Sequence, residues 1–219
     1  MNRENMKIDY FCINLDKRVD RWENFLQSAI QAGFDDVEIQ RFSAIENQFG
    51  ALGCAQSHLI ILTSFLIHSD SDFLCIFEDD FSFTTRKYDI INSIKELSDH
   101  TNWDALLLSG TFVTNYNNGP TINIKKLIEA QSACAYVVNK NYVHILAQKF
   151  IESVSHLKQF QYTKDLHSWI VSRAAIDVSW KSLMRSHNWY IRLPIIGHQS
   201  SGYSDIEKKI VDYSEYFPK

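Results

Sequence analysis

The chain has 219 residues, of which 45% are hydrophobic and 22% are charged, and its formal net charge at pH 7 is −4. This length and composition suit one globular domain with a sizeable core, and with only seven Gly and three Pro they exclude a disordered, collagen-like or linker-dominated chain. A chain so close to neutrality has no electrostatic basis for binding nucleic acid.

Cysteine usage and the apolar stretches both favour a cytoplasmic protein. The four cysteines form no Cys-x-x-Cys pair, and Cys12, Cys75 and Cys134 lie in apolar, strand-like runs, so buried and reduced thiols are expected. The N-terminal residues lack the apolar run of a signal peptide, and the most apolar stretch, residues 59–67, is too short to cross a bilayer. We therefore expect a cytoplasmic location, with at most peripheral contact at the inner face of a membrane.

Short β-rich runs alternate along the chain with helical segments, which predicts an α/β fold with a mostly parallel central sheet. In chain order, strands are expected at residues 8–14, 37–42, 73–77, 105–108, 133–138 and 191–196. Helices are expected at residues 20–32, 52–68, 88–97, 141–154 and 163–175. Gly33 ends the first helix, because glycine easily adopts the left-handed cap conformation. Residues 111–121 are rich in Asn, Gly and Pro, which predicts a loop.

The composition and the charge of the sequence change after Gly110. Residues 1–110 carry a formal charge of −9, and residues 111–219 carry +5. Because no repeat or linker separates these segments, we expect two halves of a single domain that spans residues 1–219.

Three consecutive acids, Glu78, Asp79 and Asp80, directly follow the apolar run at residues 73–77. Ligands of open α/β sheets bind beyond the carboxyl ends of the strands, where this triplet is placed. Side chains alternate along a strand, so Glu78 and Asp80 are expected to point the same way. Hard oxygen ligands suit Mn²⁺ or Mg²⁺, and we predict that Asp80 binds the ion directly while Glu78 supports the metal shell or contacts a ribose. The alternative is a solvated acidic loop.

Histidine supplies one further metal-ligand candidate. His198 lies in a polar segment after a late apolar run, and imidazole is an acceptable ligand for Mn²⁺. A surface-loop histidine is the alternative.

Residues 13–21 end the first strand and enter a helix, so they also lie at this edge of the sheet. Asp20 can cap the helix, while the planar guanidinium of Arg18 or Arg21 can contact a phosphate or a base. The alternative is an ordinary helix start with solvated charges.

Residues 53–58 are mostly small, which lets a helix approach another backbone closely. Ser57 and His58 are adjacent and do not face each other on a helix, and no G-x-S-x-G motif is present, so a serine hydrolase is not indicated. A histidine that packs in the core or against another helix is the plain interpretation of His58.

Together these residues resemble family 25 glycosyltransferases, the group of lipooligosaccharide galactosyltransferases and procollagen galactosyltransferase-like proteins. The similarity runs through residues 13–21, 50–59 and 76–80, and these three motifs are specific jointly. Looser matches follow at Trp103, Asp104, residues 135–138, Asp165, Pro194, Gln199, Ser204 and Asp205. The segment between Gly110 and Gln131, where acceptor contacts would be expected, is shorter than in the family.

The resemblance implies a fold of the GT-A type that holds a nucleotide-sugar, usually a UDP-sugar, through a divalent metal. It implies an inverting transfer of a sugar such as galactose to a hydroxyl of a glycan, glycolipid or protein. Residues 1–110 would hold the donor and the metal, and residues 111–219 would meet the acceptor. In such a fold the uracil and ribose would lie at Asn14, Leu15, Arg18 and Arg21, and the same pocket would be bordered by Asp79, Ser57 and His58. The acidic triplet is the family's metal-binding motif, which agrees with its placement here.

An inverting transfer needs a carboxylate that takes the proton of the acceptor hydroxyl. Asp165 is the first candidate for this base, with Trp169 one helical turn further on to lie beneath a sugar ring; Asp104 and Asp177 are weaker candidates. An acidic residue at a helix start is also common for electrostatic reasons alone. For the acceptor, dispersed lysines of the second half and Tyr116 in the expected loop are candidates, although spread lysines more often form a solvated surface.

Two other functions stay open at this point. One is a non-catalytic module that binds a nucleotide-sugar. The other is an aspartate-dependent phosphohydrolase, which would need an Asp-x-Asp motif after the first strand, where Asp16 stands alone before Lys17 and Arg18.

Overall fold

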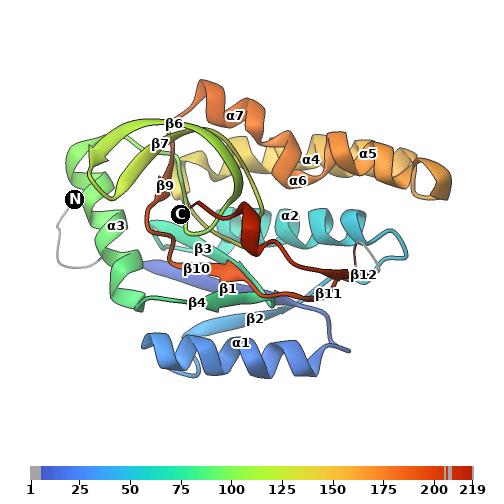
Figure 1. The fold of residues 1–219 in the computed structure, drawn as a ribbon, viewed down its shortest axis with the longest axis horizontal. Coiled ribbons are helices and arrows are strands. Elements are labelled where there is room, and N and C mark those ends of the chain that lie inside the picture. Colours follow the sequence, from blue (N-terminus) through green and yellow to red (C-terminus); the bar gives the residue numbers. More distant parts are fainter. Residues whose placement is uncertain (1–5, 205, 207–208, 219) are drawn as a thin grey trace.

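A mixed sheet of eight strands forms the centre of the computed structural model, which describes residues 6–204, 206 and 209–218, and only the backbone of residues 114 and 115 (Figure 1). The strand order is β2-β1-β3-β8-β5-β9-β7-β6. The bounds are β1 Ile8–Asn14, β2 Ile39–Ser43, β3 Phe73–Glu78, β5 Ala105–Leu107, β6 Thr111–Thr121, β7 Ile124–Gln131, β8 Ala135–Asn139 and β9 Trp189–Arg192. Two of these described strands, β7 and β8, run against the direction of the others. The predicted α/β class with a mostly parallel sheet is confirmed.

Helices cover both faces of this sheet. On one face lie α1 (Val19–Ala32) and α3 (Lys87–His100). On the other lie α2 (Gly50–His68), α4 (Val143–Gln159), α5 (His167–Ala174), α6 (Ile176–Ser179) and α7 (Lys181–Ser186). Short 3₁₀ turns precede α4 and α5, at Lys140–Tyr142 and Lys164–Leu166, and a third lies at Ser214–Tyr216. Strands β4 (Phe81–Phe83) and β10 (Gly197–Gln199) pair with each other, as do β11 (Gly202–Ser204) and β12 (Lys209–Val211).

Strand β3 is apolar throughout because helices cover it on both faces. Leu74 and Ile76 belong to the core beneath α2 and α4, while Cys75 and Phe77 belong to the core beneath α1 and α3. This alternation places the side chain of the last strand residue, Glu78, on the α2 side of the sheet.

Residues 111–121 form a long strand instead of the predicted loop. Strand β6 pairs with β7, which the sequence pattern did not predict, and the pairing is interrupted by register shifts. The buried residues of β7, Ile124, Leu127 and Ala130, recur every third residue and hide the two-residue period of a strand. Tyr116 therefore lies on an edge strand of the sheet.

Helix α2 is long and apolar enough to cross a membrane by length and composition, and half of its most apolar window is buried inside the protein. The same description fits the core helix of a globular protein. Here α2 packs against α4 and contributes Leu52, Ile61, Leu62 and Phe65 to the core. The four cysteines are free, and Cys12, Cys75 and Cys134 are buried as predicted.

The first turn of α2 lies in close contact with the loop that follows β2. A Cβ atom at Gly53 would lie 2.3 Å from the carbonyl oxygen of Ile45, so this contact requires glycine. We predict that Gly53→Ala lowers the free energy of unfolding by about 1–3 kcal/mol, because the overlap with a backbone atom outweighs the better helix propensity of alanine.

Urea denaturation measures this change, and Gly202→Ala is the matched control. Position 202 has no atom within 4 Å of an added Cβ. Equal stabilities of the two variants would contradict the close contact.

Candidate functional site

A cavity of about 460 Å³ opens at the carboxyl ends of β1 and β3. The two strands are parallel neighbours, with Ile13 paired to Glu78, so the residues that follow them meet at one edge of the sheet. The lining residues are Ile13, Leu15, Lys17, Arg21, residues 44–48, Gly50, Cys54, Glu78, Asp79, Asp80, Gln199, Tyr203, Ser204 and Ile206. The cavity thus lies at the edge of the sheet where the sequence predicts the site, and both halves of the chain contribute to it.

Asp79 is held by two side chains from the first β-strand and the first helix. Asn14 Nδ2 donates to Asp79 Oδ2 at 2.7 Å, and Arg21 Nη1 donates to Asp79 Oδ1 at 2.9 Å. Arg21 also donates to the carbonyl oxygen of Tyr203 at 2.7 Å. Both oxygens of Asp79 are therefore engaged within the protein.

Asp80 follows in a turn and is only partly engaged. Gln199 Nε2 donates to Asp80 Oδ2 at 3.0 Å, and Arg21 Nη1 lies 3.7 Å from the same oxygen. The other oxygen, Oδ1, is buried without a hydrogen-bond partner among the described residues. Because Asp80 lies beyond the end of β3, the expected alternation with Glu78 stops there: Glu78 contacts α2, and Asp80 contacts Arg21 and β10.

The three carboxyl groups have different acidities. Burial raises the pKa of Asp80 to about 7, and the neighbouring charges of Glu78 and Asp79 act in the same direction. Burial also raises the pKa of Asp79, against the opposing effect of Arg21. Burial acts on Glu78 as well, but the hydrogen bond and the charge of His58 outweigh it and leave the pKa of Glu78 below its usual value.

Ser57 and His58 lie behind the cavity wall instead of on it. Both are fully buried in α2. Ser57 Oγ accepts a hydrogen bond from the backbone of Ile45 at 2.8 Å and so fixes the loop that lines the cavity. His58 Nε2 lies 3.1 Å from Glu78 Oε1 and orients that carboxylate. Their role toward a ligand is therefore indirect.

The residues expected to contact a nucleotide also fall into two groups, those that line the cavity and those that do not. Leu15 and Arg21 line the cavity. Asn14 is 1% exposed and acts through Asp79, while Arg18 donates from Nε to Asp20 Oδ1 at 3.0 Å and does not line the cavity.

His198 points away from the acidic triplet. It lies on β10, one residue before Gln199, and successive side chains of a strand face opposite sides. Since Gln199 contacts Asp80, His198 takes the other side, where its ring contacts Phe217. The residue of β10 that reaches the site is thus Gln199, the neighbour of the predicted ligand His198.

The three candidate base residues are in different places. Asp165 is exposed in the 3₁₀ turn before α5 and lines no described cavity. Asp104 precedes β5 and accepts a hydrogen bond from the backbone of Asn188, at the opposite edge of the sheet. Asp177, in α6, accepts a hydrogen bond from the backbone of Ser132 at 3.1 Å. Burial raises the pKa of Cys54, a cavity residue, and the charges of Glu78 and Asp177 act in the same direction. Burial raises the pKa of Asp177 itself.

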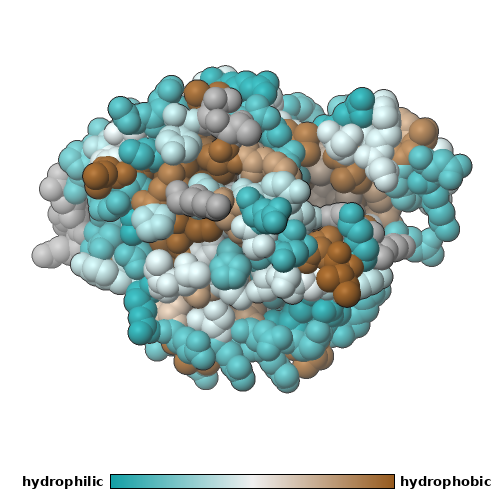
Figure 2. Space-filling model, in the orientation of Figure 1, coloured by the Kyte–Doolittle hydropathy of each residue, from teal (hydrophilic) through white to brown (hydrophobic). Residues whose placement is uncertain are grey.

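A second cavity of about 350 Å³ shares Gln48, Gly50 and Ile206 with the first. Its other lining residues include the basic side chains Lys164, His167 and Lys209, together with Phe49, Ser168 and Val171. Apolar atoms reach the surface beside it, over β11 and β12, where Ile210 is exposed (Figure 2). Asp205 lies outside the described residues.

Several residues of the site were not predicted from the sequence. Gln199 was noted only as a loose family match. Neither the cavity loop at residues 44–48 nor the side chain of Cys54 was predicted to belong to the site. Each reaches the site through a contact far away in sequence, such as Gln199 with Asp80. No local pattern signals such contacts.

Comparisons with known proteins give a likeness of fold. No family profile and no curated protein sequence matches the chain. The structure is similar to that of A197 from STIV, with a TM-score of 0.50 and 11% identity, covering 94% of this chain and 93% of that chain. It is also similar to mannose-1-phosphate geranyltransferase from Thermus thermophilus, with a TM-score of 0.47 and 8% identity, covering 85% of this chain and 74% of that chain.

A third solved structure is a glycosyltransferase involved in the glycosylation of the major capsid of PBCV-1, with a TM-score of 0.43 and 10% identity over 92% of this chain and 97% of that chain. Identities this low concern the fold alone. The fold of this chain is the α/β arrangement around a mostly parallel sheet that the sequence predicts.

Arg21 is the cation that holds the buried carboxylates of Asp79 and Asp80. We predict that Arg21→Gln lowers the free energy of unfolding by about 3 kcal/mol near neutral pH, because two carboxyl groups lose their charge partner. The figure lies at the low end of the range for such losses, since Asp80 can take up a proton.

Denaturation in urea at pH 7 measures this loss. The control, Lys149→Gln, removes a more exposed ion pair with Glu152 and should change stability by at most about 1 kcal/mol. Similar small losses in both variants would show that Arg21 does not carry this role.

Proposed function

We propose that the chain is a metal-dependent, inverting glycosyltransferase that moves a sugar from a UDP-sugar to a hydroxyl group of a glycan, glycolipid or protein. The observation that carries the proposal is the cavity at the carboxyl ends of β1 and β3, with Glu78, Asp79 and Asp80 in its wall. The resemblance to family 25 glycosyltransferases, which has its acidic motif at these residues, supports it.

The residues present fit a hard divalent cation, Mn²⁺ or Mg²⁺. Asp80 has a buried oxygen without a partner among the described residues, and burial together with the charge of Glu78 raises its pKa. Asp80 would hold the ion, with Glu78 beside it, whereas both oxygens of Asp79 are already engaged. When bound, such an ion offsets negative charge on a departing diphosphate.

The residues of the chain position the donor and keep its pocket in shape. Leu15 and the loop at residues 44–48 offer walls for a base and a ribose, and Lys17 and Arg21 supply positive charge in the same cavity. Arg21 is already bonded to Asp79 and to Tyr203, so it joins the acidic turn to the C-terminal strands. We propose that Arg21 fixes the donor pocket and contacts the nucleotide from its wall.

Transfer with inversion needs a base on the acceptor side. The acceptor oxygen attacks the anomeric carbon, the bond from that carbon to the diphosphate oxygen breaks, and the hydroxyl proton passes to a carboxylate. Asp165 was the first candidate from the sequence. Neither Asp165 nor Asp177 lines the two cavities, but Asp177 is partly buried and its charge acts on the cavity residue Cys54, whereas Asp165 is exposed. Burial also raises the pKa of Asp177, and a more basic carboxylate is a better proton acceptor.

The second cavity is the proposed acceptor position. It adjoins the first through shared walls and carries Lys164, His167 and Lys209, so an acceptor with a phosphate or carboxylate group beside its hydroxyl suits it best. Other lysines expected to form a basic face are engaged elsewhere: Lys126 donates to His187 and Asn188, and Lys149 pairs with Glu152.

The metal site gives the decisive test of this function. We predict that Asp80→Asn loses at least about a hundredfold of the Mn²⁺-stimulated hydrolysis of UDP-sugars, because an ion at this site stabilises the leaving diphosphate by several kcal/mol. Turnover with a set of UDP-sugars, with and without Mn²⁺, measures the effect.

Asp36→Asn is the matched control, since Asp36 is an exposed carboxylate in the turn before β2. Undiminished turnover in Asp80→Asn would refute the metal site. Donor binding without any turnover in the wild-type chain would favour a non-catalytic module, and release of inorganic phosphate from phosphomonoesters would favour a phosphohydrolase.

The choice of base has its own test. We predict that Asp177→Asn lowers transfer to the acceptor by about 10²–10⁴-fold while donor affinity is kept, because only the proton acceptor is removed. Asp165→Asn should keep most of the activity. The reverse result would restore Asp165 as the base, and an equal loss of donor binding in Asp177→Asn would show a structural role for that residue.

A further inference from the structure

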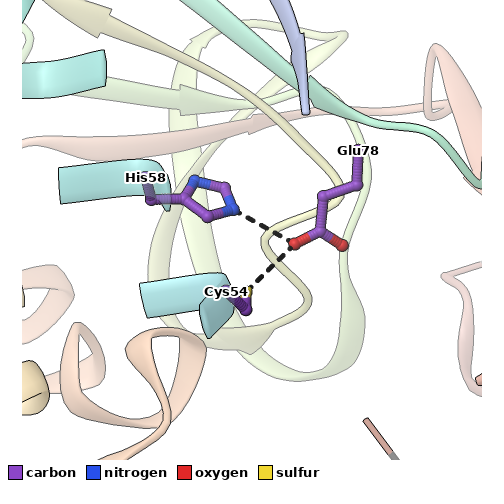
Figure 3. Close-up of side chains that lie close together, drawn as sticks. All are labelled: Cys54, His58 and Glu78. Atoms are coloured by element: carbon purple, nitrogen blue, oxygen red, sulfur yellow. Dashed lines mark hydrogen bonds and ion pairs between the residues drawn. The ribbon is translucent and has the colours of Figure 1, made fainter. Parts of the chain in front are cut away.

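A second group of metal-ligating side chains lies on the other side of Glu78. Cys54 and His58 are four residues apart on α2 and so share one face of the helix, and Glu78 reaches them from the end of β3 (Figure 3). His58 Nε2 lies 3.1 Å and Cys54 Sγ lies 3.5 Å from the same oxygen, Glu78 Oε1. All three ligand atoms lie within 4.8 Å of one another.

The two separations from Glu78 Oε1 are close to those around a tetrahedral zinc ion. Typical Zn–S, Zn–N and Zn–O lengths place neighbouring ligand atoms about 3.4–3.6 Å apart. The distances from Glu78 Oε1 to His58 and to Cys54 therefore need to change by a few tenths of an ångström only. The thiol and the imidazole favour a borderline cation such as Zn²⁺ over Mn²⁺ or Mg²⁺, which prefer oxygen ligands.

The surroundings of His58 hold the ring in the orientation that metal binding requires. Tyr136, buried on β8, places its hydroxyl 2.9 Å from His58 Nδ1, so Nε2 is directed at Glu78. Histidine ligands of metals commonly donate from the second ring nitrogen to such a partner. Cys54 and Glu78 both line the main cavity, and this leaves the fourth coordination position facing that cavity.

We propose that Cys54, His58 and Glu78 form a binding site for Zn²⁺, with three protein ligands and a fourth position open to the cavity. Binding replaces the thiol hydrogen of Cys54 by a sulfur–zinc bond and releases that proton to solvent. The site shares Glu78 with the hard-cation position proposed at Asp80 but takes its other two ligands from α2, and it stands without the glycosyltransferase proposal because its test needs no turnover.

Binding of the metal alone tests the site. The full chain, freed of metals with a chelator, is titrated with Zn²⁺ against a chromophoric competitor, and in parallel with Co²⁺ as a spectroscopic probe. We expect one equivalent of each ion to bind and a thiolate-to-cobalt charge-transfer band to appear in the near ultraviolet. Cys54→Ser should remove the band and weaken Zn²⁺ binding at least about tenfold, and Tyr136→Phe should weaken it about 10–100-fold with the band kept.

Asp36→Asn, at an exposed carboxylate in the turn before β2, is the matched control, and its zinc affinity should stay within about threefold of wild type. His58→Gln removes a buried hydrogen-bonded side chain, so its near-ultraviolet circular dichroism is compared with that of wild type before it is used. Cys54→Ser loses one weak hydrogen bond only and remains the decisive variant. No charge-transfer band in the wild-type chain, or an unchanged affinity in Cys54→Ser, would overturn the proposal.

Discussion

Buried negative charge at the end of β3 is the constraint on which the site depends. The strand is covered on both faces, so three carboxylates leave it where little water can solvate them. Compensation comes from side chains on separate elements: Asn14 of β1, Arg21 of α1, His58 of α2 and Gln199 of β10. Each contact offsets part of the buried negative charge and also fixes one element against the acidic turn. The same contacts therefore set both the electrostatics of the site and the positions of these elements.

This arrangement explains how the end of the chain becomes part of a site built mainly by its beginning. Gln199 and the carbonyl group of Tyr203 both bond within the acidic turn, through Asp80 and Arg21. The pairing of β10 with β4 brings residue 199 opposite Phe81, one residue after Asp80. Without Arg21, the C-terminal strands would keep the β4 pairing but lose their bond to α1.

Local patterns in the sequence predicted the central strands and the place of the cavity. The other features depend on pairing between residues that are far apart in the sequence. Alternating or continuous apolar runs placed β1 correctly and β3 to within one residue, and the position after β3 located the cavity. Strand β7 was missed because its buried residues recur with a period of three. His198 was chosen in place of Gln199 because the facing of β10 depends on its register with β4, which no property of residues 197–199 reveals. Asp165 and Asp177 share the same helix-start signal, and only the packing of α6 against β7 and α4 separates them.

The buried chain from Tyr136 through His58 to Glu78 has an energetic implication. Ion pairs and hydrogen-bonded groups in a core seldom add stability over well-packed apolar residues, because desolvation offsets their attraction. Tyr136 and His58 nevertheless lie fully buried among apolar and aromatic side chains such as Phe150 and Trp180. Stability alone therefore does not explain why these two polar side chains lie in the core. Their effect is to hold one oxygen of Glu78 on the α2 side and to keep the carboxylate ionised at the cavity wall, where a cation or a polar ligand can reach it.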